Sequence, residues 1–229
     1  MTTGADAVTE GADGAGSVGG PVGAGGTDGA AGAGGVTGGR VLRAQDRPAT
    51  PWKNGGGLTR EVAADDSTAG LDDFVWRVSL ADVAGSGPFS AFAGVDRIIT
   101  VVDGAGMELT VDGAVHTVAA PYEPFPFPGD AATGCRLLDG PIVDFNVMTR
   151  RSRAWAHVRM EREDFAVEPR SGVVVLAVVL QGTATVAESG VTLGRFDAVQ
   201  FSGDDAGTLR VDGVTAIVTV LTTDCDPSA

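Results

Sequence analysis

The chain has 229 residues, enough for one large or two small domains, and a formal net charge of −14. Because binding to phosphates needs a basic surface, this acidic balance argues against nucleic acid as a partner. No apolar run reaches the length of a membrane span, since the run 173–180 is only as long as a strand. Cys135 and Cys225 are too few for a disulfide framework and lack metal-ligand spacing, so we expect two reduced, structural thiols.

Residues 1–39 consist almost entirely of Gly, Ala, Thr, Val, Ser and Asp, without an aromatic residue, lysine or arginine. Such a composition cannot bury enough apolar surface to offset the entropy of ordering the chain, so we expect a disordered tail. The segment also lacks the basic start and the continuous apolar core of a secretory signal. We therefore expect a cytoplasmic protein whose folded part begins near Arg40.

The segment Pro51–Val62 combines an aromatic residue, cations, an amide and three successive glycines. Three adjacent glycines cost conformational entropy and add no packing, so a folded domain keeps them where the backbone bends sharply or approaches something closely. Polar side chains and free backbone N–H donors would then lie together at the start of a strand, which suits a small polar or anionic ligand. An ordinary tight turn is the alternative interpretation.

From Leu42 onward, short alternating apolar segments rich in Val, Ile, Thr and Phe are separated by Gly, Asp and Pro. Segments of this length, spaced by roughly 8–12 residues, predict an all-β sandwich or barrel. The predicted strands are 74–80, 98–102, 107–111, 115–118, 143–148, 173–180 and 216–221. Segment 159–165 is one place where charge and spacing favour a turn or a short helix.

The two halves repeat the same features in the same order. A strand that ends in a Gly turn, a Phe-x-Gly-Asp turn and a closing strand occur within 98–148 and again within 176–221. Phe127 and Phe201 would fill the core, while the Gly-Asp pair would supply a turn with positive φ. The repetition predicts duplication of a small β-barrel, with these two phenylalanines in equivalent places.

This order of strands and turns resembles the cupin family of double-stranded β-helix barrels, here as two jelly-roll barrels in tandem. Closure of that kind protects the sheet edges that many short strands would otherwise expose. The predicted division is a tail at 1–39, an N-terminal barrel that carries the site at 40–150, and a C-terminal barrel at 151–229.

A set of motifs read in order resembles the HutD/Ves family of bacterial bicupins. The motifs are PWKNGGGxTRE at 51–61, WRVS at 76–79, GPFSxFxGxDR at 87–97 and DFNVMTRR at 144–151. The resemblance is dense in the first barrel and weak in the second. It implies a cytoplasmic protein, often encoded with histidine-utilisation genes, that restrains or tunes this pathway by binding a small metabolite such as urocanate or formylglutamate. The family has no securely attached catalytic reaction.

The sequence does not favour a metal site or a nucleophile. Metal-dependent cupins use two or three histidines and a carboxylate, whereas this chain has only His116 and His157, in different predicted barrels. Ser79 and Ser90 lack a Gly-x-Ser-x-Gly elbow. We therefore assign no metal ligand, no cofactor and no catalytic residue.

Arginines and amides are better candidates for a binding site. Arg60, Arg77 and Arg97 lie in or beside apolar strand-like sequence, where charge is rare unless paired. Strand alternation puts Asp144 and Asn146 on one face, as expected of a barrel lumen that contacts a ligand. Guanidinium groups bind carboxylates in bidentate geometry, and an amide can donate and accept beside them.

The predicted ligand-binding residues are Lys53, Asn54, Gly55, Gly56, Gly57, Arg60, Arg77, Ser79, Asn146 and Arg150. In the alternative interpretation, the arginines at positions 60, 77 and 150 pair only with Glu61, Asp96 and Asp144 and brace the fold. Trp52 either stacks on a planar ligand or closes the barrel mouth.

We predict a regulatory protein that binds a small organic acid, similar to urocanate or formylglutamate, and modulates histidine utilisation. The alternative is a metal-independent cupin enzyme, an isomerase or hydrolase acting on a small acidic metabolite. A third hypothesis is a structural dimerisation module without a ligand, and the sequence leaves a homodimer open.

Overall fold

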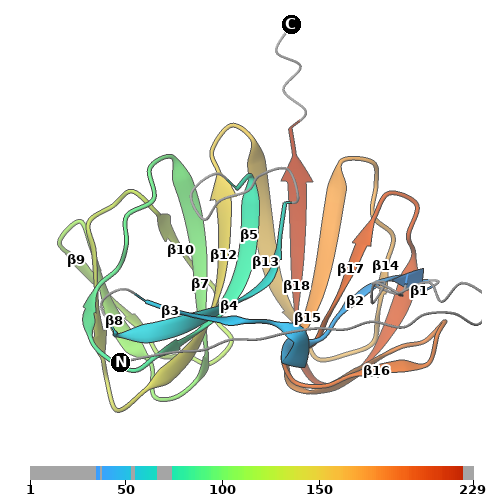
Figure 1. Cartoon of the computed structure of the whole chain (residues 1–229), viewed down its shortest axis with the longest axis horizontal. Helices are drawn as coiled ribbons and strands as arrows, with labels where there is room; N and C mark the ends of the chain where they lie inside the picture. Colours follow the sequence, from blue (N-terminus) through green and yellow to red (C-terminus); the bar gives the residue numbers. More distant parts are fainter. Residues whose placement is uncertain (1–34, 37, 53–54, 66–73, 224–229) are drawn as a thin grey trace, which may run out of the picture. The chain divides into compact units, whose positions relative to one another are not determined.

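Strands account for nearly all regular structure in the computed structural model, which describes residues 35–36, 38–52, 55–65 and 74–223 (Figure 1). The described residues all belong to one compact unit, 33–229. Most of the predicted tail 1–39 lies outside the described residues. None of the described residues forms a helix long and apolar enough to span a membrane.

The first half of the chain forms two antiparallel sheets, B and C. Sheet B has the strand order β10-β7-β12-β5-β4-β3, and sheet C has the order β6-β11-β8-β9. The strands of sheet B are β3 (Ala49–Pro51), β4 (Gly57–Ala64), β5 (Trp76–Val83), β7 (Val95–Asp103), β10 (Phe125–Pro128) and β12 (Ile142–Arg150). The strands of sheet C are β6 (Gly87–Pro88), β8 (Met107–Val111), β9 (Ala114–Val118) and β11 (Thr133–Leu137).

Sheet B is buried on both faces because its side chains alternate between two cores. One face packs against sheet C and encloses a barrel lumen, whose apolar residues include Ala81, Val83, Ile99, Val101, Met107, Leu109 and Cys135. The other face packs against the second half of the chain through Val78, Leu80, Phe145, Val147, Leu176, Val178 and Val218. Residues 144, 146 and 148 therefore face the barrel lumen, as predicted.

The second half forms sheet A, with the strand order β1-β2-β17-β15-β18-β13 and with β14 and β16 paired beside this path. Its strands are β1 (Gly35–Val36), β2 (Gly39–Leu42), β13 (Ala154–Glu161), β14 (Phe165–Val167), β15 (Val173–Val186), β16 (Val191–Leu193), β17 (Ala198–Ser202) and β18 (Gly207–Thr222). Together the three sheets give the all-β, cupin-type double-stranded β-helix that the sequence predicted.

Strands β15 and β18 bend where Gly182 pairs with Gly213. Both glycines have positive φ, and a Cβ on either one would overlap the backbone of the opposite strand. Residues before and after this bend, including Val175 and Val186, share one apolar core. Sheet A therefore folds over itself around its own lumen.

The two halves share a strand order, β10-β7-β12-β5 in sheet B and β17-β15-β18-β13 in sheet A. Phe127 pairs with Arg97 on β7, and Phe201 pairs with Val175 on β15. Both phenylalanines are buried. They occupy equivalent register positions, which supports the predicted duplication.

The segment 159–165, predicted as a turn or short helix, forms no helix, and only residues 162–164 bend between two strands. Residues 154–161 form β13, which pairs along its length with β18, and β14 begins at Phe165. The charged residues Arg159 and Glu161 alternate with apolar ones, so their spacing fits a half-exposed strand.

The segment Gly39–Pro51, which we call the strap, joins sheets A and B. Its strand β2 pairs with β17 in sheet A, its strand β3 pairs with β4 in sheet B, and the 3-10 helix η1 (Ala44–Asp46) lies between them (Figure 1). Residues 40–42 thus belong to sheet A, although the predicted N-terminal barrel begins at residue 40. The division of the chain into domains otherwise remains a prediction.

Candidate functional site

Arg97 on β7 is a buried cation in the lumen between sheets B and C. Only 6% of this residue is exposed, and its guanidinium lies over the rings of Phe89, Phe92 and Phe127, at 5.2, 5.7 and 4.9 Å from the centroids. Such cation–π contacts stabilise a desolvated guanidinium by about 0.5–2 kcal/mol each. Its Nε has no hydrogen-bond partner among the described residues. The aromatic cage therefore supports the charge without using all of its donors.

The motif at 87–97 builds this cage. The N–H groups of Phe89 and Phe92 donate to the carbonyl oxygens of Thr133 and Gly129, at 2.9 and 2.8 Å. These bonds hold the loop after β6 against the end of the barrel. The rings of Phe89 and Phe92 in this loop therefore contact Arg97, the last residue of the same motif.

Asp144 on β12 is the buried anion of the lumen. It is 2% exposed, and its Oδ1 lacks a hydrogen-bond partner within the described part of the chain. Burial raises the pKa of Asp144 to about 7, although the positive charge of Arg97 lowers it. Burial also lowers the pKa of Arg97 to about 10, so the guanidinium remains charged at neutral pH.

Asn146 and Ser79 are neighbours on the same face of sheet B. They are paired across β12 and β5, and both are buried. The Oδ1 atom of Asn146 has no hydrogen-bond partner among the described residues. Since a buried polar atom without a partner costs about 1–3 kcal/mol, this oxygen and that of Asp144 favour a polar guest in the lumen.

Arg77 also faces the lumen. Met148 pairs with both Arg77 and Arg97, so the two arginines flank this residue in one row across the sheet. The Nε of Arg77 donates to Glu61 Oε2 at 2.8 Å. Arg77 therefore forms the ion pair with Glu61 that the bracing interpretation expects. It lies on the same face of sheet B as the unpaired oxygens of Asp144 and Asn146.

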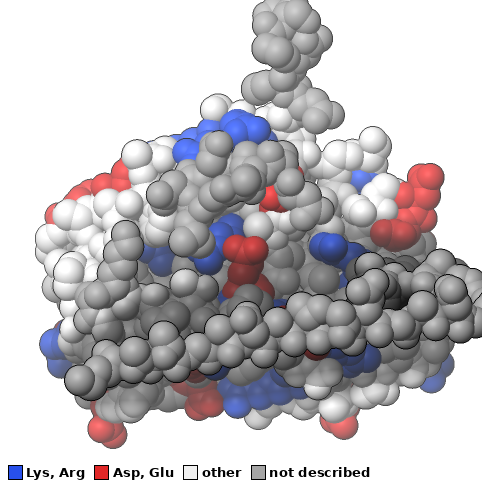
Figure 2. Space-filling model, in the orientation of Figure 1, with Lys and Arg blue, Asp and Glu red and all other residues white. Residues whose placement is uncertain are grey.

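Arg60 is among the predicted ligand-binding residues, but it does not share this lumen with Arg77 and Asn146. Arg60 pairs in register with Leu80, which faces sheet A, and alternation puts Arg60 on that same face. Its guanidinium forms an ion pair with Asp82. Figure 2 shows acidic and basic side chains next to one another in the middle of the visible face.

The glycine triplet holds Trp52 at one end of the lumen. Gly55 has positive φ, and a Cβ on Gly57 would overlap the carbonyl oxygen of Asp82 and crowd the Trp52 ring. The indole packs against the lumen core and donates from Nε1 to Thr59 Oγ1 at 2.8 Å. Gly56 accepts from the N–H groups of residues 84 and 85. Lys53 and Asn54 lie outside the described residues.

Arg150 lies at the end of β12 and contacts backbone. Its Nε donates to the carbonyl oxygen of Phe74 at 3.1 Å, and its guanidinium lies 5.7 Å from the centroid of that ring. Asp96, one of the expected partners of the arginines, binds Arg151 instead, at 2.6 Å. These contacts fit a bracing role for Arg150 better than a place in the lumen.

The two histidines lie on different sheets. His116 packs on Phe125, with ring centroids 4.9 Å apart, and His157 stacks on Trp155 at 6.2 Å. Within the residues that the structure describes, no group of three or more His, Cys, Asp or Glu side chains could hold a metal ion.

Cys135 is a buried thiol of the lumen core. Its Sγ lies 3.5 Å from Met107 Sδ, and burial raises its pKa to about 11, so the thiol is protonated and unreactive at neutral pH. Cys225 lies outside the described residues.

The sequence predicted the polar face of β12, but the predicted site omitted the two buried charges of the lumen, Arg97 on β7 and Asp144 on β12. Arg97 stood out as a charge within an apolar strand, and Asp144 shared a face with Asn146. These two signals could have placed both residues in the predicted site, which contained neither. The aromatic cage had no such signal, because Phe89 and Phe92 read as ordinary core residues.

Comparisons with known proteins are consistent with this architecture. A family model described as HutD matches residues 44–219. The chain is 41% identical over 168 residues to a protein of Pseudomonas putida named "Uncharacterized 21.2 kDa protein in hutC 3'region", a match that covers 72% of this chain and 88% of that protein. It is 38% identical over 133 residues to protein Ves of Citrobacter koseri, covering 57% of this chain and 68% of that protein.

Among solved structures, HutD from Pseudomonas fluorescens SBW25 superposes with a TM-score of 0.71 at 37% identity, covering 80% of this chain and 98% of that one. A second, described as a conserved protein of unknown function from Pseudomonas aeruginosa, gives a TM-score of 0.69 at 35% identity, with 80% and 97% coverage.

Proposed function

Because the chain belongs to the HutD family, we propose that it is a regulatory protein that binds a small organic acid in the lumen between sheets B and C. The names of its relatives refer to HutD and to the region beside hutC. On this basis the ligand is a metabolite of histidine utilisation, such as urocanate or formylglutamate, and its binding tunes that pathway.

One observation carries this proposal: a buried guanidinium and two buried oxygens lie on the same face of sheet B, and each has unused hydrogen-bonding capacity. Arg97 would donate to the carboxylate of the ligand, while Asp144 and Asn146 would accept from a donor at its other end. Charge-assisted hydrogen bonds of this kind are roughly twice as strong as neutral ones. Burial strengthens them further because water does not compete.

The ligand must therefore carry an anion at one end and an N–H or O–H donor at the other. Urocanate has a carboxylate and a ring N–H, and formylglutamate has carboxylates and an amide N–H. A planar acid without a donor, such as trans-cinnamate, would leave the oxygens of Asp144 and Asn146 unpaired.

Isothermal titration calorimetry with urocanate, N-formylglutamate and trans-cinnamate tests this proposal. We expect one of the first two acids to bind and trans-cinnamate to bind at least tenfold more weakly. The substitution Arg97→Met removes charge-assisted hydrogen bonds worth about 1.5–3 kcal/mol, so the affinity should fall by about 10- to 100-fold.

Arg136→Met is the matched control, because this exposed arginine pairs with Glu108 on sheet C. It should leave the affinity unchanged. Equal affinities of wild type and Arg97→Met, or failure of both metabolites to bind, would contradict a ligand site in the lumen.

A specific observation also favours a second candidate, a metal-independent enzyme acting on a small acidic metabolite. Asp144 has a pKa of about 7, and a general acid or base works best when its pKa lies near the operating pH. Proton NMR of each acid incubated with the protein tests this candidate. If new resonances appear with the wild type and are absent with Asp144→Asn, the protein catalyses a reaction. Unchanged spectra with the wild type would contradict catalysis and leave ligand binding as the proposed function.

A further inference from the structure

A cavity of about 410 Å³ lies between the strap and sheets A and B. Its polar walls come from Arg47 of the strap and from Arg60 and Asp82 of sheet B, and its apolar walls come from Leu80, Val143 and Phe196. This volume falls within the range of small-molecule sites, and so does the combination of apolar walls with a few polar groups. The cavity is separate from the barrel lumen, since its sheet B residues face away from that lumen.

The ion pair between Arg60 and Asp82 presents both signs of charge to this cavity. The two side chains are similarly exposed, at 41% and 44%. A ligand with a single charge would meet one of them favourably and be repelled by the other. A zwitterion would place its carboxylate at the guanidinium and its ammonium group at the carboxylate, so that all four charges have opposite neighbours.

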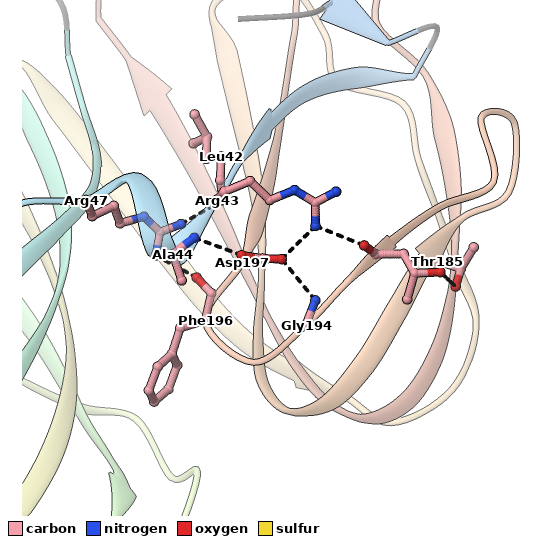
Figure 3. Close-up of polar contacts among 9 residues, drawn as sticks. Leu42, Arg43, Ala44, Arg47, Thr185, Gly194, Phe196 and Asp197 are labelled. Atoms are coloured by element: carbon pink, nitrogen blue, oxygen red, sulfur yellow. Dashed lines mark hydrogen bonds and ion pairs between the residues drawn. The ribbon is translucent and has the colours of Figure 1, made fainter.

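Arg47 adds a second positive charge that is held in place. Its Nη1 donates to the carbonyl oxygen of Phe196 at 2.5 Å and its Nη2 to that of Leu42 at 2.9 Å, as Figure 3 shows. Its Nε is buried and has no partner among the described residues. Arg47 lines the cavity, so its positive charge favours the carboxylate end of a ligand there.

Asp197 fixes this wall of the strap. It accepts from Arg43 Nη1 at 2.7 Å and from the N–H of Ala44 at 2.8 Å (Figure 3). It also accepts from the N–H of Gly194 at 3.0 Å. A wall tied by this many bonds is preorganised, so little ordering is needed when a ligand binds.

Phe196 supplies an aromatic wall at a cost in backbone strain. Its φ of 68° is uncommon for a bulky residue, and such strain is kept at sites where the surrounding structure holds it. Arg195 covers the ring at 4.5 Å from the centroid and is itself held by Asp103 at 2.8 Å. With Leu80 and Val143, this ring forms a surface for an apolar or planar side chain.

We propose that this cavity binds a free α-amino acid with an apolar or planar side chain. The carboxylate lies at Arg60 and Arg47, the ammonium group lies at Asp82, and the side chain lies against Phe196. This site is independent of the organic-acid site in the lumen.

Calorimetry with L-phenylalanine, L-leucine and L-histidine, and with the single-charge analogues 3-phenylpropionate and phenethylamine, tests the proposal. At least one of the amino acids should bind, and L-phenylalanine should bind at least tenfold more tightly than either analogue. Binding of 3-phenylpropionate as tight as that of L-phenylalanine, or no binding of any amino acid, would overturn the proposal.

The variants Arg60→Met and Asp82→Asn should each weaken amino-acid binding by at least tenfold, while Arg136→Met, which removes an exposed pair elsewhere, should not. Because breaking the ion pair could impair folding, Val143→Phe provides a second route: it fills the cavity, leaves both charges in place and should abolish binding. Unchanged affinity in folded Val143→Phe would refute the site.

Arg97→Met separates this proposal from the lumen site. It should retain amino-acid binding and lose organic-acid binding, and Arg60→Met should do the reverse. Loss of amino-acid binding in folded Arg97→Met would place the amino acid in the lumen and overturn the second site.

Discussion

The lumens of the two halves have equivalent strands but different linings. In register terms, Val175 takes the place of Arg97, Ile217 that of Asn146, and Thr215 that of Asp144. The core of the second lumen contains Val, Ala, Leu, Ile and Phe side chains, whereas the first encloses a buried arginine and a buried aspartate. Since polar groups inside a fold cost stability, the apolar second lumen stabilises the protein, and the polar lining of the first supports the proposal that it holds a ligand.

Moving the amide of the first lumen into the second should have the largest effect. Ile217→Asn deletes an almost fully buried apolar side chain and leaves an amide without partners among valines and leucines. We expect the free energy of unfolding to fall by roughly 3–5 kcal/mol. Urea denaturation monitored by circular dichroism measures this change, and a loss below 1 kcal/mol would show that the second lumen also tolerates polar groups.

Removing the titratable group of the first lumen should have an intermediate effect that depends on pH. Because the pKa of Asp144 is raised from 3.8 to about 7, the folded protein holds a proton that the unfolded chain releases in this range. Protonated Asp144 therefore contributes its full stabilisation below about pH 4, and this contribution is lost as the pH rises through about 7.

Asp144→Asn lacks this titration, so at pH 8 it should be more stable than the wild type by roughly 1–3 kcal/mol, and at pH 4 the difference should vanish. Denaturation series at both pH values provide the measurement. Parallel stability curves across this range would show that Asp144 titrates normally, and its carboxyl group would then not be desolvated in the first lumen.

The reverse exchange, Asn146→Ile, should have the smallest effect on stability. It replaces an amide with an unpaired oxygen by the residue type found at the equivalent position in the second lumen. We expect the free energy of unfolding to change by no more than about 1 kcal/mol, because removing the unpaired amide oxygen offsets the imperfect packing of the new side chain. Organic-acid binding should weaken at least tenfold in the same variant. A large destabilisation without a change in affinity would assign Asn146 to the fold.

Local pattern was enough to predict the polar face of β12 and the strands β5, β7, β8, β9, β12, β15 and β18. The apolar run 107–111 matches β8 because alternation within one strand is a local property. The predicted strand 173–180 was too short, since Gly182 suggested a turn. That glycine bends the strand instead, because it faces Gly213 across the ladder. Such a pairing joins residues far apart in sequence and leaves no local signal.

The position of Arg60 could not be derived from its own segment. A register shift interrupts the pairing of β4 between Glu61 and Ala63, so alternation counted along the chain fails beyond it. The cavity beside Arg60 depends on Arg47 and Phe196, which lie 149 residues apart and meet through one hydrogen bond. Arg77 and Asn146 could thus each be placed on a strand from the sequence. The sequence could not show that Arg60 lies on one face of sheet B while these two residues lie on the other.

The strap has a consequence for the order in which the protein folds during synthesis. A ribosome completes residues 39–47 early, yet Gln200 and Asp197, their partners in sheet A, emerge about 150 residues later. Contacts this distant in sequence form slowly because a long loop must close first. We expect β2 to remain unpaired with sheet A on the nascent polypeptide until β17 has been synthesised, and the strap to dock last.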